Sequence, residues 1–184
     1  LKRRGRAEVS GAAGPATAQL TAGSVRSSVN NSVKILFVGD IFGQPGRRIV
    51  KELLPRLMEE HAPDLVLANG ENAAGGFGIT PDTAQELFDS QVDVITTGGH
   101  VWDRKEAEFY LNEENRVLRP LNYPPGVPGR GYNRRNNVMV VNLMGRVFIG
   151  TLDCPFRAMD ALLEGASGSP LVVVDFHAEA TSEK

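Results

Sequence analysis

Acidic, amide and imidazole side chains follow four apolar segments of the sequence. They are Asp40 after residues 33–38, Glu71 and Asn72 after residues 64–68, His100 after residues 92–96, and His177 after residues 171–176. In open parallel sheets the ligand crevice lies outside the carboxyl ends of the strands, so we expect these side chains to meet at one edge. Asp, Glu and His suit divalent ions such as Mn, Fe or Zn. Their convergence predicts a metal-dependent site.

Each of these residues also has a purely structural interpretation. Asp40 precedes a predicted helix and would serve there as an N-cap. Glu71 and Asn72 would fit a solvated loop, and an isolated histidine is more often structural than a metal ligand. His61 follows Glu59 and Glu60, and we interpret it as a surface residue at a helix end. The metal hypothesis therefore depends on the four positions acting together.

The turn after the first apolar segment offers a rival interpretation. Gly39, Gly43 and Gly46 resemble a dinucleotide-binding loop, whose usual pattern is Gly-x-Gly-x-x-Gly. Asp40 occupies the start of this turn, and a carboxylate there would repel a pyrophosphate unless a cation lay between them. The turn therefore favours a metal over a bare dinucleotide.

The remaining pattern predicts an α/β fold. Apolar residues from Ile49 to Met58 recur with a 3.6-residue period and predict a helix that contains Pro55. Thr80 and Pro81 predict the start of a second helix, and the spacing of Asp103 and Glu106 predicts a capping box for a third. Alternation of strands and helices argues for a mainly parallel sheet covered by helices. Further on we expect a hairpin of residues 138–143 and 147–152, a helix over 156–164 and a strand over 171–176.

Composition gives only broad limits. The chain has 184 residues, of which 41% are hydrophobic and 23% charged, which is typical of one globular domain. The apolar runs are far shorter than the roughly 20 residues that span a bilayer. Cys154 is the one cysteine, so an intrachain disulfide is excluded. We interpret it as structural rather than as a catalytic thiol.

Residues 1–32 differ in composition from the rest. They are rich in small residues and poor in large apolar ones, which predicts disorder. They hold five basic side chains and one acidic side chain, a charge balance of +4. Because the whole chain has a net charge of −2, residues 33–184 have a net charge of −6. This mildly acidic domain does not suggest a surface that coats nucleic acid. The extension loosely matches an organelle transit peptide, but we favour an artefact at the gene start.

Four motifs together resemble the YmdB-type metallophosphoesterases of the calcineurin-like superfamily. They are Lys34-Ile-Leu-Phe-Val-Gly-Asp40, Asn69-Gly-Glu-Asn-Ala-Ala74, Thr97-Gly-Gly-His-Val-Trp-Asp103 and Asp175-Phe-His-Ala-Glu-Ala-Thr-Ser-Glu-Lys184. The resemblance covers residues 33–184, which we take as one domain, and leaves residues 1–32 without a counterpart.

The resemblance implies a sandwich of two sheets flanked by helices and a metal-dependent phosphodiesterase that acts on 2',3'-cyclic nucleotides. Asp40 would bind the first of two divalent metals, such as Fe or Mn. Glu71 would bridge both, and His177 would bind the second. Two metals of this kind lower the pKa of a bridging water and so make hydroxide at neutral pH. His100 would protonate the leaving oxygen, and Asn72 would lie near the phosphate. Family members are usually cytoplasmic, with no membrane segment, and often self-associate.

Two departures from the family pattern weaken the expected site. Gly99 stands where the family has an asparagine ligand of the second metal. The family also has a later Gly-Thr-His-Thr-His segment, so we expect this chain to be a truncated form with partly uncovered apolar strands after residue 138. Loss of ligands lowers metal affinity. The alternative function is therefore a catalytically impaired or inactive relative or fragment that acts as a nucleotide-binding or interaction module.

Overall fold

The computed structural model describes residues 32–135, 137–168 and 170–184. The predicted disorder of residues 1–32 therefore lies, apart from Ser32, outside the described residues. Residues 32–184 form one compact unit that contains two β-sheets. Its strands are β1 Ile35–Val38, β2 Leu65–Asn69, β3 Val94–Thr96, β4 Val117–Leu118, β5 Tyr132–Arg135, β6 Val138–Met144 and β7 Leu171–His177. Its helices are α1 Gly43–His61, α2 Pro81–Asp89, η1 Gly99–Trp102, α3 Ala107–Glu113, α4 Pro155–Glu164 and η2 Thr181–Glu183.

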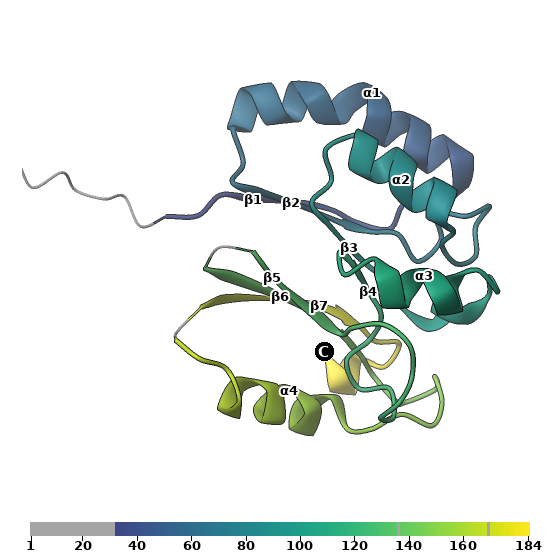
Figure 1. Ribbon diagram of the computed structural model, residues 1–184, viewed down its shortest axis with the longest axis vertical. Helices are drawn as coiled ribbons and strands as arrows, with labels where there is room; N and C mark the ends of the chain where they lie inside the picture. Colours follow the sequence, from purple (N-terminus) through teal and green to yellow (C-terminus); the bar gives the residue numbers. More distant parts are fainter. Residues whose placement is uncertain (1–31, 136, 169) are drawn as a thin grey trace, which may run out of the picture. The chain divides into compact units, whose positions relative to one another are not determined.

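The first sheet has the order β1-β2-β3-β4, and all of its strand pairs are parallel. Every residue of β2 and β3 is buried, which explains why these segments are apolar on both faces. Parallel neighbours need crossover connections, and α1, α2 and α3 provide them. Figure 1 shows α1 and α2 together on one side of this sheet. The predicted parallel sheet with covering helices is confirmed.

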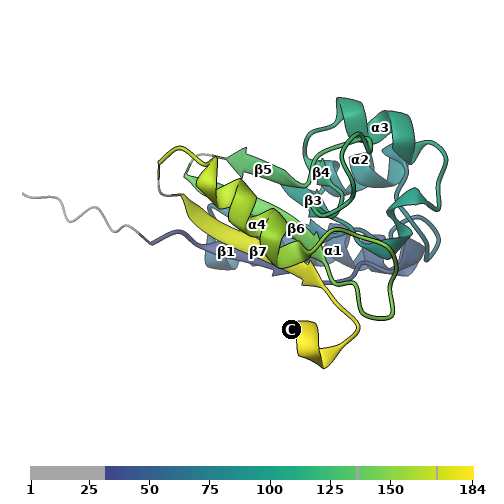
Figure 2. The same cartoon turned by 90° about the horizontal axis from the view of Figure 1, so that it is seen from below.

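The second sheet has the order β5-β6-β7, with β5 antiparallel to β6 and β6 parallel to β7. The helix α4 connects β6 to β7 and lies along the outer side of this sheet (Figures 1 and 2). The short η2 follows β7 and projects from its end (Figure 2). The predicted sandwich of two sheets flanked by helices is therefore confirmed.

Three apolar clusters hold these layers together. One lies between α1, α2 and the first sheet, and another between the second sheet and α4. The third joins the two sheets through side chains from both: Leu65, Leu67, Val94, Leu118, Val138 and Val140. The sheets thus pack face to face, and their strand ends share a common edge where polar side chains gather.

The structure corrects two of the local predictions. Residues 147–152 form turns and not a strand, because Phe148 has a φ of 67°, which breaks an extended chain, and is 90% exposed. The antiparallel partner of β6 is instead β5, whose sequence has no apolar strand pattern. The predicted capping box is also wrong. Asp103 ends η1 and accepts from the ring of His100, while α3 begins after Glu106 without a side-chain cap.

Other local predictions are confirmed. Thr80 caps α2 through a reciprocal bond pattern with Thr83 and is followed by Pro81. Pro55 lies within α1, which continues through it as a single helix.

Within the described part of the chain, no helix combines the length and apolar character needed to cross a bilayer.

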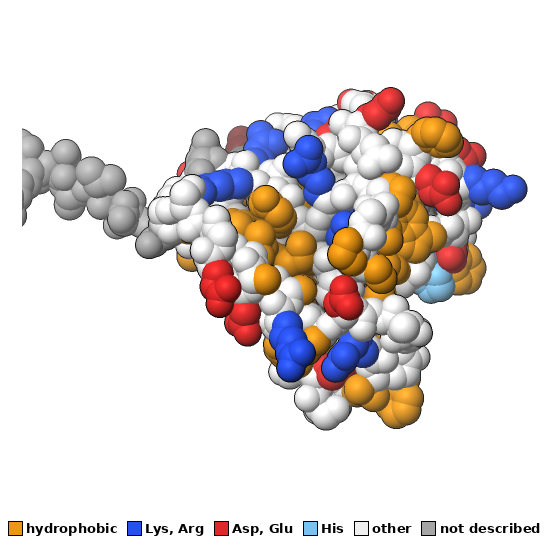
Figure 3. All heavy atoms as spheres, turned by 60° about the horizontal axis from the view of Figure 1, so that its bottom comes forward, with side chains coloured by type: hydrophobic (Ala, Val, Ile, Leu, Met, Phe, Trp, Pro, Cys, Tyr) orange, Lys and Arg blue, Asp and Glu red, His pale blue; other side chains and the backbone are white. Residues whose placement is uncertain are grey.

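The expected uncovering of the later strands holds for only one of them. All of β6 is buried, whereas β7 is only partly buried and leaves Leu171 and Val174 exposed. Figure 3 views the unit from its α4 side and shows hydrophobic side chains gathered between charged ones on that face. Exposed apolar side chains on the second sheet and α4 include Phe156, Leu163, Leu171 and Val174, and others lie on α1 and α3.

Candidate active site

Three strand ends bring the predicted polar residues to one edge of the sandwich. Asp40 follows β1, Glu71 and Asn72 follow β2, and His177 ends β7. Backbone bonds join the first two loops, because Ile41 N donates to Asn69 O at 3.0 Å and Gly43 N donates to Asn72 O at 2.9 Å. The parallel arrangement of β1 and β2 therefore fixes Asp40 beside the Glu71 loop.

A pocket of about 310 Å³ opens at this edge. It contains four of the predicted site residues together with a third carboxylate, Asp175. Its lining is Phe37, Gly39, Asp40, Asn69, Glu71, Asn72, Asp175, Phe176, His177, Ala178 and Lys184. The strand ends thus converge on a space of the size that a small phosphorylated ligand would occupy.

The most buried charge in the pocket belongs to Glu71, which is 4% exposed. Its Oε2 lies 3.0 Å from Nδ1 of His177, and its Oε1 accepts from the backbone N–H of His100 at 3.1 Å. Burial raises the pKa of the Glu71 carboxyl. The hydrogen bond and charge of His177, together with the His100 N–H, lower this pKa by more than burial raises it, so it lies below the ordinary value. The bond to Glu71 raises the pKa of the His177 imidazole more than burial lowers it. The two groups therefore favour a carboxylate–imidazolium pair.

Hydrogen bonds orient the other pocket side chains. Asn72 donates from Nδ2 to Oδ1 of Asp40 at 3.0 Å. Oδ2 of Asp175 accepts from Asn69 at 2.9 Å and from Thr96 at 2.5 Å. Because Asp175 belongs to the second sheet and Asn69 and Thr96 belong to the first, this carboxylate joins the two sheets at the pocket.

His100 contacts the site through its backbone, and its ring is not among the groups that line the pocket. The ring Nδ1 lies 2.8 Å from Oδ2 of Asp103, and the ring packs edge-on against Phe77 with centroids 5.1 Å apart. The side chain is 43% exposed. Of the four acidic and imidazole groups expected to meet, three line the pocket and the fourth stands beside it.

Two neighbouring glycines approach the Glu71 carboxylate differently. A Cβ at Gly98 would lie 2.0 Å from Oε2 of Glu71, which no side chain can do. A Cβ at Gly99 would lie 3.7 Å from Oε1 of Glu71 and 3.9 Å from Sδ of Met144, which is ordinary contact. Gly98 therefore makes room for the carboxylate, while the space at Gly99 admits a side chain.

The chemistry of these donors fits divalent metals. Carboxylate, imidazole and amide oxygen are the groups that Mn, Fe and Zn accept. Two ligands on adjacent corners of one ion, each about 2.1 Å from it, are about 3 Å apart, and the Glu71 and His177 atoms are 3.0 Å apart. Among residues 32–135, 137–168 and 170–184, however, no group of three or more His, Cys, Asp or Glu side chains has the spacing of metal ligands.

This fold, with the strand ends of both sheets converging on carboxylates and a histidine, defines the metallophosphoesterase class. The YmdB-like protein family model matches residues 36–184, so the chain belongs to this family. The chain is 45% identical over 157 residues to the 2',3'-cyclic-nucleotide 2'-phosphodiesterase of Bacillus subtilis, covering 83% of this chain and 60% of that protein.

Two solved structures share the fold. A crystal structure of a hypothetical protein from Thermus thermophilus is 46% identical, with a TM-score of 0.77, over 83% of this chain and 60% of that one. A crystal structure of a novel phosphatase from Mycoplasma pneumoniae is 32% identical, with a TM-score of 0.75, over 83% and 58%. The chain thus spans about three fifths of the length of these relatives.

Sequence reasoning missed three residues of the site. Asp175 is a carboxylate at a strand end beside His177, and this position is the signal that could have identified it. Gly98 carried no signal, because its role is a clearance that only the fold creates. Asp103 was interpreted as a helix cap, and its i,i+3 spacing from His100 would have indicated their contact.

Proposed function

We propose that this chain hydrolyses phosphodiesters, with 2',3'-cyclic nucleotides as the substrate class, at the pocket between the ends of β1, β2 and β7. The observation that carries the proposal is the convergence of Asp40, Glu71, Asn72 and His177 on one pocket. The Bacillus subtilis relative, a 2',3'-cyclic-nucleotide 2'-phosphodiesterase, supports the choice of substrate.

Divalent metals would be held by Asp40, Glu71 and His177, with Glu71 shared between two ions. Metals bound in this way would supply a nucleophile at neutral pH and neutralise charge on the phosphoryl oxygens. The chain itself contributes the orientation of these ligands. Glu71 is fixed by the His100 N–H and by burial, and Asp40 by the amide of Asn72.

His100 would act as the acid that protonates the leaving oxygen. Its Nδ1 lies 2.8 Å from Oδ2 of Asp103, which orients the ring and leaves Nε2 as the proton donor. A substrate held at the pocket by Asn72 would need its leaving oxygen on the His100 side. Movement of the exposed His100 ring towards the pocket would bring its Nε2 within hydrogen-bond reach of the leaving oxygen.

The three histidines of the chain allow a matched test. We would measure hydrolysis of bis-p-nitrophenyl phosphate and of 2',3'-cyclic AMP with Mn²⁺, together with Mn²⁺ binding by calorimetry. His177→Ala should weaken Mn²⁺ binding and turnover, and His100→Ala should lower turnover while Mn²⁺ binding persists. His61→Ala, at the exposed end of α1, should change neither. Equal effects of all three variants, or an unchanged rate in His100→Ala, would contradict these roles.

The second candidate is nucleotide binding without turnover. It is favoured by Gly99, which offers no side chain as a ligand, and by the lack of a three-ligand cluster among the described residues. Calorimetry with 2',3'-cyclic AMP separates the two functions. Binding with no product formed over hours in Mn²⁺ would establish the binding module and exclude the enzyme.

A further inference from the structure

We propose that Arg47 and Arg104 are positioning residues that fix the loop of residues 70–79, which carries Glu71 and Asn72. That the arginines fix the loop is argued from contacts alone, whereas their effect on catalysis rests on the proposed function. Neither guanidinium lines the candidate pocket, so both would act through the loop.

The loop has little regular structure of its own to hold it. Residues 71–77 are turns and a bend between β2 and α2. Gly75, Gly76 and Gly78 have φ values of 73°, 98° and 74°, a conformation that glycine adopts without the steric cost that other residues incur. A segment with so much glycine loses much conformational entropy when it is ordered, and therefore needs outside contacts to stay in one shape.

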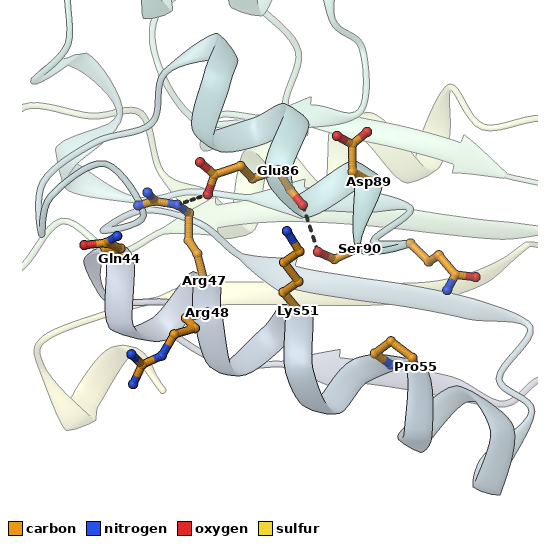
Figure 4. Close-up of a pocket in the computed structure, with 9 residues that line it drawn as sticks. Gln44, Arg47, Arg48, Lys51, Pro55, Glu86, Asp89 and Ser90 are labelled. Carbon is orange, nitrogen blue, oxygen red and sulfur yellow. Dashed lines mark hydrogen bonds and ion pairs between the residues drawn. The ribbon is translucent and has the colours of Figure 1, made fainter.

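Arg47 supplies the first of these contacts from α1. Its Nη1 donates to the carbonyl oxygen of Ala73, and its Nε donates to Oε2 of Glu86 on α2 at 2.5 Å. The side chain is only 14% exposed. Figure 4 shows it reaching from α1 towards Glu86, whereas Arg48 on the next position points away from α2. The Glu86 carboxylate thus holds the guanidinium against the loop.

Arg104 supplies the second contact from the segment between η1 and α3. Its Nη2 donates to the carbonyl oxygen of Ala74, and its Nε donates to that of Phe77 at 3.0 Å. A Cβ at Gly78 would lie 3.0 Å from Cγ of Arg104, and one at Gly75 would lie 3.4 Å from Nη2. The glycines therefore let the loop close around the arginine side chain.

The two arginines bind consecutive carbonyl groups, those of Ala73 and Ala74, immediately after Glu71 and Asn72. Hydrogen bonds from a charged donor are shorter and stronger than neutral ones, and the planar guanidinium fixes direction as well as distance. A misplacement of a reacting group by about 1 Å can lower a rate by about 100-fold. We call the contacts of the Arg47 and Arg104 guanidinium groups with the loop carbonyls the clamp. Loss of either arginine should therefore impair the site more than it impairs the fold.

Arg47→Met and Arg104→Met test this, with Arg48→Met as the matched control. Arg48 lies on the same helix with its side chain 72% exposed and its nearest carboxylate, that of Glu52, 3.7 Å away. We expect kcat per folded molecule with Mn²⁺ and bis-p-nitrophenyl phosphate to fall by about 10- to 100-fold in either clamp variant. Hydrogen exchange of residues 71–78 should accelerate at least about tenfold, while Arg48→Met matches the parent chain. Arg47→Lys and Arg104→Lys, which keep one charged donor, should recover part of both losses.

The two readouts separate this inference from the proposed function. Unchanged exchange of the loop in both Met variants would overturn the clamp, whatever the activity. Faster exchange with kcat unchanged would overturn the catalytic part. If the parent chain neither turns over substrate nor binds Mn²⁺, the proposed function fails, and the catalytic part of the inference fails with it. The exchange result would then still confirm or overturn the clamp.

Discussion

Replacing Gly98 with alanine should dismantle the candidate site through a single methyl group. The added Cβ would lie 2.0 Å from Oε2 and 2.5 Å from Cδ of the Glu71 carboxylate. Contact between carbon and oxygen needs more than 3 Å, so the carboxylate must move by about 1 Å or more. Glu71 is buried and is held by His177 and by the His100 N–H. It cannot move that far and keep both partners.

The cost follows from those lost partners. A hydrogen bond to a charged group contributes about 1.5–3 kcal/mol, and forcing extra volume into a packed site costs about 1–3 kcal/mol. Partial relaxation of the side chain makes the smaller sum the better guide, so we expect the free energy of unfolding to fall by about 3 kcal/mol. In a domain of this size, that lowers the melting temperature by about 6–12 °C.

Gly99→Ala is the matched control, because its Cβ would meet the same carboxylate at 3.7 Å. Both variants would be followed by thermal unfolding and by calorimetric titration with Mn²⁺. Gly98→Ala should lose stability and Mn²⁺ binding together, while Gly99→Ala should keep both near the parent values. Equal stability and equal Mn²⁺ affinity in the two variants would refute the packing of Gly98 against Glu71.

Three further predictions concern the same site. Gly99→Asn should strengthen Mn²⁺ binding by at least about tenfold at little cost in melting temperature, because the position has room for a side chain; unchanged Mn²⁺ affinity would remove the position from the ligand set. Asp175→Ala should lower the free energy of unfolding by about 2–4 kcal/mol in urea, since it removes the acceptor for Asn69 and Thr96, and Asp175→Asn should lose less; equal losses would contradict the role of the acceptor oxygen. In chelator, the raised pKa of His177 gives stability that is present below pH 6.5 and lost as pH rises through the folded value. The lowered pKa of Glu71 gives stability that is present above pH 4.5 and lost as pH falls through the folded value. Urea unfolding should therefore show the pair most stabilising between pH 4.5 and 6.5, and His177→Ala should abolish the decline on the alkaline side.

The first half of the fold follows from the sequence because its signals are local. Strands buried on both faces give unbroken apolar runs, and α1 shows a 3.6-residue apolar period from Ile49 to Met58. The second sheet was harder to predict. β5 has the sequence Tyr-Asn-Arg-Arg and no apolar pattern, because it is exposed and is held mainly by the backbone of β6. Residues 147–152 are apolar yet form turns, so composition alone suggested a hairpin that the chain does not make.

The site was predictable to the extent that parallel strands align their carboxyl ends. That rule placed Asp40, Glu71 and His177 together, and they do line one pocket. It could not place the ring of His100, because a 3₁₀ turn follows β3 and directs this residue's backbone, rather than its ring, to Glu71. Nor could it reveal the clearance at Gly98, which depends on the distance between two loops that are 27 residues apart in the sequence.

The pairing of Glu71 with His177 links the fold of this site to its proposed chemistry. In the chain alone, the imidazolium compensates a carboxylate that burial would otherwise make costly. A metal ligand must be a neutral imidazole, so metal binding by Glu71 and His177 would require His177 to release a proton. The pair holds Oε2 of Glu71 and Nδ1 of His177 3.0 Å apart, which is close to the distance between two ligands of one ion. The contact that stabilises the buried carboxylate would therefore also set the proton cost of metal binding.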